Sequence, residues 1–239
     1  MERFLENKSA IVTGGTRGIG REIVRSLAQA GCAVALCGRD AGASERAAAE
    51  LAEATGGRVY GTGCEVSDRA SVRAFFEFAS GTAGEPDIVV NNAGIGIFSP
   101  LGDLSETDWQ KVIETNLTGV FHCSQEAVRR FRLRGGGFLI HIGSLAGKNP
   151  FAGGAAYNAS KFGLIGMAEA MMLDHRQENV RVCTIMPGSV DTDFSPRSGK
   201  ASWKIAPEDI AEIVLSVLRM PERTLVSRVE VRPSRPQKG

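Results

Sequence analysis

The stretch "SAIVTGGTRGIGREIVRSLAQAG", residues 9–31, sets a structural pattern that the rest of the chain repeats. A short apolar, β-branched run ends in the glycine-rich turn "TGGTRGIG", and a segment with helical spacing of apolar residues follows at once. Glycines at 14, 18 and 20 let backbone N–H groups approach a pyrophosphate at the helix N-terminus. The spacing is G-x-x-x-G-x-G rather than G-x-G-x-x-G, so close packing of strand on helix is the alternative interpretation.

Short apolar runs alternate with longer amphipathic segments along the whole chain. We predict strands in "SAIVTG", "CAVALCG", "RVYGTGCEV", "DIVVNNAG", "GFLIHIGS", "VRVCTIMPG" and "SRVEVR". We predict helices over residues 18–30, 41–54, 68–80, 105–133, 156–176 and 207–220. Strict alternation implies right-handed crossovers and a parallel sheet with helices on both faces. The predicted fold is therefore a three-layer, doubly wound α/β domain with about seven strands, whose ligands bind beyond the carboxyl ends of the strands.

The composition of the chain favours a single-domain protein that binds neither nucleic acid nor a membrane surface. No linker or repeat interrupts the sequence, so residues 1–239 are predicted to form one domain, with a flexible, Pro-rich and basic tail at 233–239. The 28 basic and 27 acidic side chains give no net field that would favour nucleic acid or an anionic membrane. No signal-peptide or membrane-spanning pattern is seen in the sequence, and we expect a cytoplasmic protein.

Metal and disulfide sites are not predicted. The five cysteines are scattered and none is spaced as CxxC, which argues against a disulfide framework and against a zinc site. His122, His141 and His175 also lack the spacing of metal ligands.

The residues after the second predicted strand bear on the choice of nucleotide. The sequence "CAVALCGRD" places Gly38, Arg39 and Asp40 where an acidic residue would accept a ribose 2′-hydroxyl and a cation would bind a 2′-phosphate. Arg39, with Arg17 from the glycine turn on the same side, favours NADP(H). Asp40 is the competing signal, because a carboxylate turned toward the ribose would favour NAD(H). Arg39 as an ordinary solvated loop cation is the remaining alternative.

Further motifs follow the later predicted strands in a fixed order. They are "NNAG" at 91–94, Asn116 in "ETNLTG", Ser144 in "HIGS", Y-x-x-x-K at Tyr157 and Lys161, and "PGSVDT" at 187–192. Each motif alone is a weak signal. Together with the glycine turn, and over nearly the whole chain, they resemble the short-chain dehydrogenase/reductase family in its compact single-domain form, similar to 3-oxoacyl-[acyl-carrier-protein] reductases. The resemblance implies a Rossmann fold.

Tyr157 and Lys161 have a physical interpretation beside that resemblance. Residues at i and i+4 lie on one face of a helix, so the ammonium can lie near the phenol. An ordinary tyrosine has a pKa of about 10, and a nearby cation stabilises the phenolate, so we expect Lys161 and the nicotinamide charge together to lower the pKa of Tyr157. Tyr157 would then exchange a proton with a substrate carbonyl oxygen, and Ser144 would hydrogen-bond the same oxygen.

The resemblance implies roles for further residues. Lys161 would also hold the nicotinamide ribose, and Asn116 would support Lys161 through water. The family's Asp-Val pair near adenine is Glu65-Val66 here. The predicted catalytic residues are Asn116, Ser144, Tyr157 and Lys161. The predicted cofactor-binding residues are Gly14, Thr16, Arg17, Gly18, Ile19, Gly20, Arg39, Glu65, Val66, Asn92, Ala93, Gly94, Tyr157, Lys161, Pro187, Gly188, Val190 and Thr192.

The predicted activity is NADPH-dependent hydride transfer between nicotinamide and a small-molecule carbonyl or secondary alcohol. An NAD(H)-dependent alcohol or sugar dehydrogenase remains an alternative, as does a dinucleotide sensor without turnover, although a sensor would not need an activated phenol. Candidate pocket residues, each equally compatible with a place in the core, are Ile97, Phe98, Phe151, Phe194 and Trp203.

Two surfaces suggest partners. The cluster "RRFRLR" at 129–134 would suit an acidic carrier protein bearing a 3-oxoacyl thioester, but cations in the last turn of a helix also stabilise its dipole. The segment "SKFGLIGMAEAMML" after Tyr157 is apolar or small on nearly every face. We therefore expect a homodimer or homotetramer built on this helix and on the one at 105–133, as is common in the family.

Overall fold

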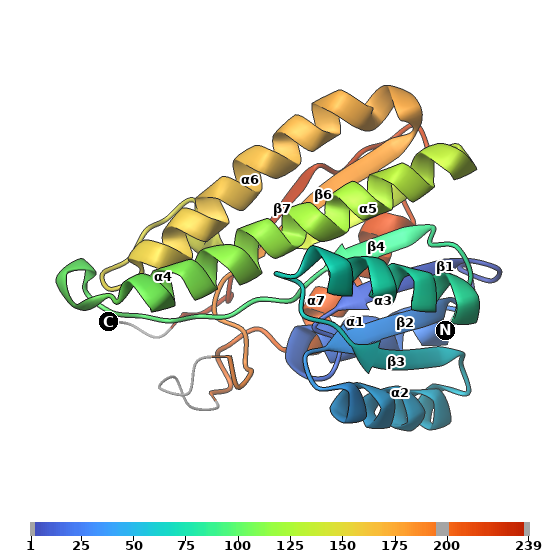
Figure 1. Ribbon diagram of the computed structural model, residues 1–239, viewed down its shortest axis with the longest axis horizontal. Helices are drawn as coiled ribbons and strands as arrows, with labels where there is room; N and C mark the ends of the chain where they lie inside the picture. The colour runs from blue at the N-terminus through green and yellow to red at the C-terminus, as the bar shows by residue number, and fades with distance from the viewer. Residues whose placement is uncertain (1–2, 195–200, 237–239) are drawn as a thin grey trace.

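Seven parallel strands form one sheet in the order β3-β2-β1-β4-β5-β6-β7 (Figure 1). The computed structural model describes residues 3–194 and 201–236. The strands are β1 Ser9–Thr13, β2 Ala33–Gly38, β3 Val59–Gly63, β4 Ile88–Asn91, β5 Gly137–Ile142, β6 Val180–Pro187 and β7 Arg228–Val231. The chain order reverses between β1 and β4, and a crevice for ligands is expected beyond the carboxyl ends of the strands at that point. The predicted doubly wound Rossmann fold is confirmed.

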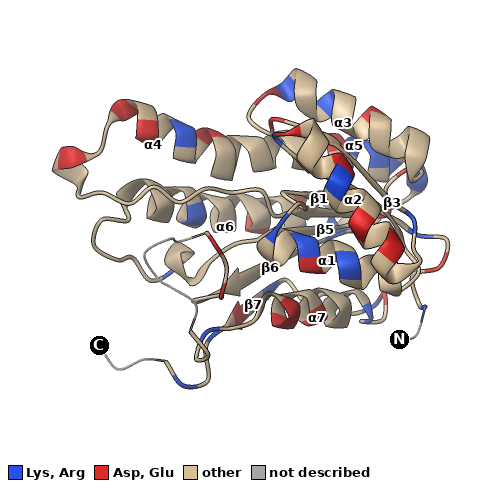
Figure 2. Cartoon of the chain, turned by 90° about the horizontal axis from the view of Figure 1, so that it is seen from below, with Lys and Arg blue, Asp and Glu red and all other residues tan. Residues whose placement is uncertain are grey.

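Helices cover both faces of the sheet. One face carries α1 Gly18–Gln29, α2 Ala41–Thr55 and α7 Pro207–Leu218, and the other carries α3 Arg69–Thr82, α4 Glu106–Ile113, α5 Gly119–Arg134 and α6 Ala155–His175. Short 3₁₀ turns lie at Leu101–Asp103, Leu145–Gly147 and Arg176–Glu178. Figure 2 shows α3 and α5 on one side of the strands and α1 and α7 on the other.

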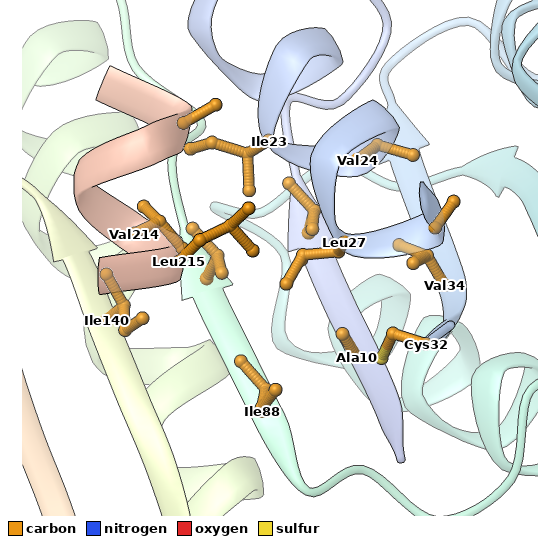
Figure 3. Packing of buried hydrophobic residues seen from close by; sticks show 14 of the residues in the cluster. Ala10, Ile23, Val24, Leu27, Cys32, Val34, Ile88, Ile140, Val214 and Leu215 are labelled. Carbon is orange, nitrogen blue, oxygen red and sulfur yellow. The ribbon is translucent and has the colours of Figure 1, made fainter. Parts of the chain in front are cut away.

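The hydrophobic core packs α1 and α7 against the central strands. Ile23 and Leu27 of α1 pack with Leu215 of α7 over the apolar side chains of β1, β4 and β5 (Figure 3). All three side chains are fully buried, and full burial of one such side chain contributes about 2 kcal/mol. A second buried cluster packs α3 and α5 against the other face of the sheet. The sheet that carries the loops at the strand ends is therefore closely packed on both faces.

The helix predicted at 105–133 is interrupted. Ser105 caps α4 by accepting a hydrogen bond from the Asp108 N–H at 3.1 Å, as the "SETD" pattern predicts. A π-helical turn over Glu114–Thr118 then separates α4 from α5. This wider turn contains Asn116, whose buried side chain bonds the backbone of Ile95. The spacing of apolar residues in the sequence does not predict this π-helical turn, because hydrogen bonds to a distant segment stabilise the turn.

The arginine cluster at 129–134 lies at the end of α5, beside the amino ends of the strands and away from the ligand-binding edge. Arg130 is buried and bonds the carboxylates of Glu77 and Glu85. Arg132 pairs with Glu178 and Arg134 with Asp87. These arginines therefore join α5 to neighbouring segments, in addition to their effect on the helix dipole.

Two parts of the earlier predictions lie partly outside the described residues. Residues 233–236 of the predicted flexible tail are described and form no helix or strand, and residues 237–239 lie outside the described range. The loop after Thr192 is described to Phe194 and again from Ala201. Within the described residues, no helix is long and apolar enough to cross a membrane.

Candidate active site

A cleft of about 1340 Å³ opens at the carboxyl edge of the sheet. It is lined by the glycine turn, by the segments that follow β2, β3, β4, β5 and β6, and by the start of α6. Nearly every residue predicted to bind cofactor or to act in catalysis lines this cleft, and the exceptions are Gly20 and Asn116. Among the candidate pocket residues, Phe98, Phe151, Phe194 and Trp203 line it, whereas Ile97 does not.

The glycine turn is shaped by close backbone contacts. Gly14 has a φ of +66°, and a Cβ there would lie 2.9 Å from the Cα of Ala93. A Cβ on Gly18 would lie 3.3 Å from Cγ2 of Thr192, so these two residues face each other. A Cβ on Gly20 would overlap the Gly14 carbonyl oxygen. Gly20 thus packs beneath the turn and does not line the cleft, and its predicted contact with the cofactor remains a prediction.

The N-terminus of α1 is open to an anion. Arg17 is the N-cap residue, its side chain makes no capping hydrogen bond, and the first turn contains no acidic residue. The unpaired N–H groups and the positive end of the helix dipole therefore lie beside Gly18 and Ile19 at the cleft. With glycines that leave room for close approach, this arrangement fits a pyrophosphate.

Asn92 ties the ends of β1 and β4 together across the switch point. Its Nδ2 donates to the carbonyl oxygens of Thr13 and Gly14 at 3.0 and 2.9 Å. The backbone N–H groups of Asn92 and Ala93 both donate to Thr13 Oγ1 at 3.1 Å. The "NNAG" turn therefore shapes the glycine turn as well as the wall of the cleft.

The far end of the cleft contains the residues that bear on the nucleotide. Asp40 caps α2, with Oδ1 accepting from the Ala43 N–H at 2.6 Å, so its carboxylate is engaged by the helix. A Cβ on Gly38 would lie 2.9 Å from Thr16 Cγ2. Arg17 and Arg39 are exposed, and no carboxylate of the described residues pairs with either. This end of the cleft therefore offers two arginine side chains that could bind an anion.

Glu65 and Val66 line the same end of the cleft. The Glu65 carboxylate accepts hydrogen bonds from the Ser67 N–H at 3.2 Å and the Ser67 hydroxyl at 2.9 Å. A contact between Glu65 and adenine, which the resemblance implies, remains a prediction.

Ser144, Tyr157 and Lys161 meet at the opposite end of the cleft. Ser144 follows β5, and its hydroxyl is hydrogen-bonded to that of Tyr157 in the first turn of α6. Lys161 donates from Nζ to the Ile142 carbonyl oxygen at 3.1 Å, and its Nζ lies 5.7 Å from the centre of the Tyr157 ring. The sequence spacing thus places the phenol and the ammonium on one helix face, as predicted.

Burial is the main cause of the pKa shifts of both groups. Burial raises the pKa of Tyr157, and the hydrogen bond with Ser144 acts in the opposite direction. Burial lowers the pKa of Lys161 to about 8. The protein by itself therefore does not lower the pKa of Tyr157, and the expected lowering with the nicotinamide charge present remains a prediction. The physical reason is that desolvation of the phenolate outweighs the favourable contacts, while the Lys161 ammonium is directed to a carbonyl oxygen.

The short chain dehydrogenase family model matches residues 8–202. The chain belongs to the short-chain dehydrogenase/reductase family. It is accordingly an oxidoreductase acting on CH–OH or C=O groups.

Individual relatives agree with this assignment. The chain is 36% identical over 195 residues to a 3-oxoacyl-[acyl-carrier-protein] reductase of Chlamydia muridarum, covering 82% of this chain and 79% of that protein. An alcohol dehydrogenase from Thermococcus sibiricus, solved with 5-hydroxy-NADP, has a TM-score of 0.89 at 31% identity, over 97% of this chain and 99% of that one. A 7α-hydroxysteroid dehydrogenase solved with NADH and 7-oxo glycochenodeoxycholic acid also has a TM-score of 0.89, at 29% identity over 98% and 96%.

In this short-chain dehydrogenase, Asn116 is fully engaged with its neighbours. Its Nδ2 donates to the Ile95 carbonyl oxygen at 2.9 Å and to Ser160 Oγ at 3.2 Å, and its Oδ1 accepts from the Ile95 N–H at 2.8 Å. Ser160 in turn donates to the carbonyl oxygen of Tyr157. Asn116 thus braces the turn of α6 between Tyr157 and Lys161. Its support of Lys161 through water remains a prediction.

The sequence interpretation missed Asn158. Its Nδ2 donates to the Ala146 carbonyl oxygen at 2.6 Å, and its Oδ1 accepts from the Phe151 N–H at 3.4 Å. These bonds hold the segment after Ser144 against α6, which sets Ser144 beside Tyr157. No periodicity identifies this role, although Asn158 lies within the Y-x-x-x-K motif.

Beneath the site, the histidine at 141 is fully buried on β5 and accepts at Nδ1 from Asn91 Nδ2 at 3.2 Å. Burial and the positive charge of Lys161 lower its pKa to about 3. A neutral imidazole therefore lies under the lysine at physiological pH.

Proposed function

We propose that this enzyme transfers hydride between NADPH and a carbonyl or secondary alcohol, with Tyr157 as general acid and base. The observation that carries the proposal is the Ser144–Tyr157 hydrogen bond beside Lys161, in the same cleft as the glycine turn. The nicotinamide, when bound, donates or accepts the hydride. Tyr157 donates its proton to the substrate oxygen during reduction, and Ser144 stabilises negative charge on that oxygen by donating a hydrogen bond.

Lys161 acts on the phenol and on its surroundings. Its pKa of about 8 keeps the amine largely protonated at neutral pH despite burial. That charge, close to the Tyr157 ring, stabilises the phenolate left after proton transfer. By resemblance to the family, Lys161 would also hold the nicotinamide ribose, and the backbone of "PGSVDT" with Thr192 would hold the carboxamide.

The dinucleotide would be held by features already visible in the cleft. The first turn of α1 would bind the pyrophosphate, and Asn92 to Gly94 would lie along the cofactor. NADPH is proposed over NADH because Asp40 caps α2 while Arg17 and Arg39 face the cleft. Solved relatives contain both cofactor types, as 5-hydroxy-NADP and as NADH.

A screen of carbonyl compounds tests the proposed function. The purified protein is mixed with NADPH or NADH and a panel of ketones, aldehydes and 3-oxoacyl thioesters, and reduced nicotinamide is followed by absorbance. Carbonyl-dependent oxidation of NADPH is expected. Binding of NADPH without turnover of any compound would favour the alternative, a dinucleotide sensor.

Replacing Arg39 with alanine tests the cofactor preference. A charge-assisted contact with a 2′-phosphate would be lost, so the Kd for NADPH should rise by about 10- to 100-fold, while the Kd for NADH changes by less than about 2-fold. Arg46→Ala is the matched control, because Arg46 is exposed on the adjoining helix α2 and does not line the cleft. Equal effects on both cofactors would contradict a contact with the 2′-phosphate.

A 3-oxoacyl thioester reductase is the second candidate, favoured by the similarity to the Chlamydia muridarum reductase. Arg129 is half exposed and only loosely paired with Glu126 at 3.8 Å, but a carrier docked there would lie beside the amino ends of the strands, away from the cleft that would receive its thioester. Arg130 is unsuited to testing this idea, since its replacement would break the buried contacts with α3.

We also propose a homodimer or homotetramer. Large apolar side chains on the outer helices α4, α5 and α6 remain exposed in the single chain, among them Trp109, Phe121 and Leu173. A partner subunit would cover these side chains, because patches of this kind are uncommon on monomers. Light scattering at micromolar concentration should give twice or four times the mass of one chain. A monomeric mass would contradict the proposal.

A further inference from the structure

Three phenylalanine rings surround Tyr157 on the open side of the cleft. Their centres lie 5.6 Å (Phe98), 5.8 Å (Phe194) and 6.4 Å (Phe151) from the centre of the Tyr157 ring. Phe98 and Phe151 also contact each other edge to face, with centres 5.6 Å apart. The three rings come from the segments after β4, β5 and β6, and all three line the cleft. We call these three residues the phenylalanine cage.

The backbone is shaped to seat these rings. A Cβ on Gly96 would lie 2.7 Å from Phe98 Cζ and 2.9 Å from Phe194 Cε1, so only the lack of a side chain at Gly96 lets both rings close over it. A Cβ on Gly154 would lie 2.8 Å from the Phe151 ring. The segments that carry Phe98 and Phe151 are linked by a hydrogen bond from the Ser99 N–H to the Gly153 carbonyl oxygen at 2.9 Å. The cage is therefore set by several local contacts.

The three phenylalanine side chains are much more exposed to solvent than the Tyr157 side chain that they surround. Phe98, Phe151 and Phe194 are 37%, 46% and 40% exposed, whereas Tyr157 is only 9% exposed. The rings keep water from the phenol and present apolar surface to the cleft. A carbonyl oxygen that reaches the hydroxyls of Ser144 and Tyr157 must bring its neighbouring atoms against these rings. Polar groups on those atoms would lose water without finding hydrogen-bond partners on the rings.

An aromatic group of a substrate should bind to the phenylalanine cage better than a flexible aliphatic group. The cage rings meet Tyr157 at interplanar angles of 51° to 76°, which is the tilted and edge-on packing that aromatic groups prefer. An aromatic ring of the substrate can pack on the cage rings in the same tilted or edge-on geometry, and it loses little rotational freedom on binding. A flexible aliphatic chain gains no such contacts and loses more conformational freedom.

We propose that the phenylalanine cage is the substrate-recognition surface and that the enzyme reduces ketones with an aryl ring bonded directly to the carbonyl carbon. The inference rests on the proposed function, since the Tyr157 hydroxyl marks the position of the reacting oxygen only if Tyr157 is the proton donor. In the reaction, the carbonyl carbon accepts the hydride, the oxygen accepts the Tyr157 proton, and NADPH is oxidised to NADP⁺.

Three ketones of different shape test the proposal. The values of kcat/KM are measured with NADPH for acetophenone, for 2-octanone and for the N-acetylcysteamine thioester of acetoacetate. Acetophenone should exceed each of the others by at least about 10-fold. Phe98→Leu and Phe151→Leu should each lower the value for acetophenone by about 10-fold and lower that for 2-octanone by less, so that the preference for acetophenone falls.

Phe162→Leu is the matched control. Phe162 is 46% exposed, as is Phe151, but it lies on the outer side of α6 and does not line the cleft. Leucine keeps this surface apolar, and light scattering checks that the oligomeric state is unchanged. The control should retain the full preference for acetophenone.

A binding measurement separates failure of the cage from failure of the proposed function. Calorimetry follows acetophenone binding to the NADP⁺-loaded Tyr157→Phe variant, with and without Phe98→Leu, and the second substitution should weaken binding by about 10-fold. Unchanged binding, or a wild-type preference for 2-octanone or the thioester, would overturn the inference. A third outcome is that Phe98→Leu weakens acetophenone binding but the wild type reduces no carbonyl compound. This outcome would support the cage as a binding surface and overturn the proposed function.

Discussion

Tyr157→Phe is expected to lower kcat for carbonyl reduction by about 10²- to 10⁴-fold, which is the usual contribution of a positioned general acid. The substitution removes the hydroxyl that Ser144 bonds and leaves the ring among Phe98, Phe151 and Phe194. Phenylalanine keeps the apolar packing, so the fold and the cofactor cleft should be preserved. The Kd for NADPH should therefore change by less than about 2-fold.

Steady-state turnover measures kcat, and single-turnover experiments measure the rate constant of hydride transfer. The Kd for NADPH is measured separately by fluorescence. Tyr60→Phe is the control, because Tyr60 is the other tyrosine of the chain and lies on β3 outside the cleft. This control should retain wild-type kcat. If Tyr157→Phe retains full activity, Tyr157 is not the proton donor, and the proposed mechanism is wrong.

Lys161→Met is expected to raise the free energy of unfolding at pH 7 by about 2 to 3 kcal/mol while abolishing turnover. Burial lowers the pKa of Lys161 from 10.5 to about 8, and a difference of this size corresponds to roughly 3 kcal/mol of cost for keeping the buried amine charged. The lost hydrogen bond to the Ile142 carbonyl oxygen offsets about 1 kcal/mol of the gain. Methionine fills a similar volume without a charge.

The pH dependence of this stabilisation follows from linkage. Below pH 8 the lysine is protonated in both the folded and the unfolded state, so the folded wild type bears the full cost of the buried charge. As the pH rises from 8 to 10.5, the folded state loses its proton first, and the wild type gains stability relative to the variant. The advantage of Lys161→Met should therefore shrink through this range.

Urea unfolding of the cofactor-free protein at pH 7 and pH 10 measures this difference. Lys111→Met, on the exposed surface of α4, is the control and should change the free energy of unfolding by less than about 0.5 kcal/mol at either pH. Destabilisation by Lys161→Met at pH 7, or a stabilisation that does not vary with pH, would show that burial of the ammonium carries no such cost.

The candidate site shows where sequence reasoning succeeds. Tyr157 and Lys161 share a helix face because their spacing matches the helical period. Ser144 and the "NNAG" turn meet them because parallel strands end at one edge of the sheet. These relations depend on local geometry and strand order, and both can be read along the chain.

Other features depend on contacts between distant segments. The Asp40 carboxylate caps α2, and Gly20 packs beneath Gly14, although residue type alone suited both to a cofactor contact. The π-helical turn at Asn116 exists because its side chain bonds the backbone of Ile95. No periodic pattern predicts such contacts, because their partners are far away in the sequence.

The sequence by itself determined the order of strands and helices, the anion-binding turn and the residues that meet at the carboxyl edge, because these follow from periodicity and from residue types at strand ends. Only the tertiary structure decided how those residues behave. Burial raises the pKa of Tyr157 and lowers that of Lys161, and three loops bring Phe98, Phe151 and Phe194 around the phenol. Desolvation and ring packing depend on all the atoms surrounding a group, and these come together only in the folded chain.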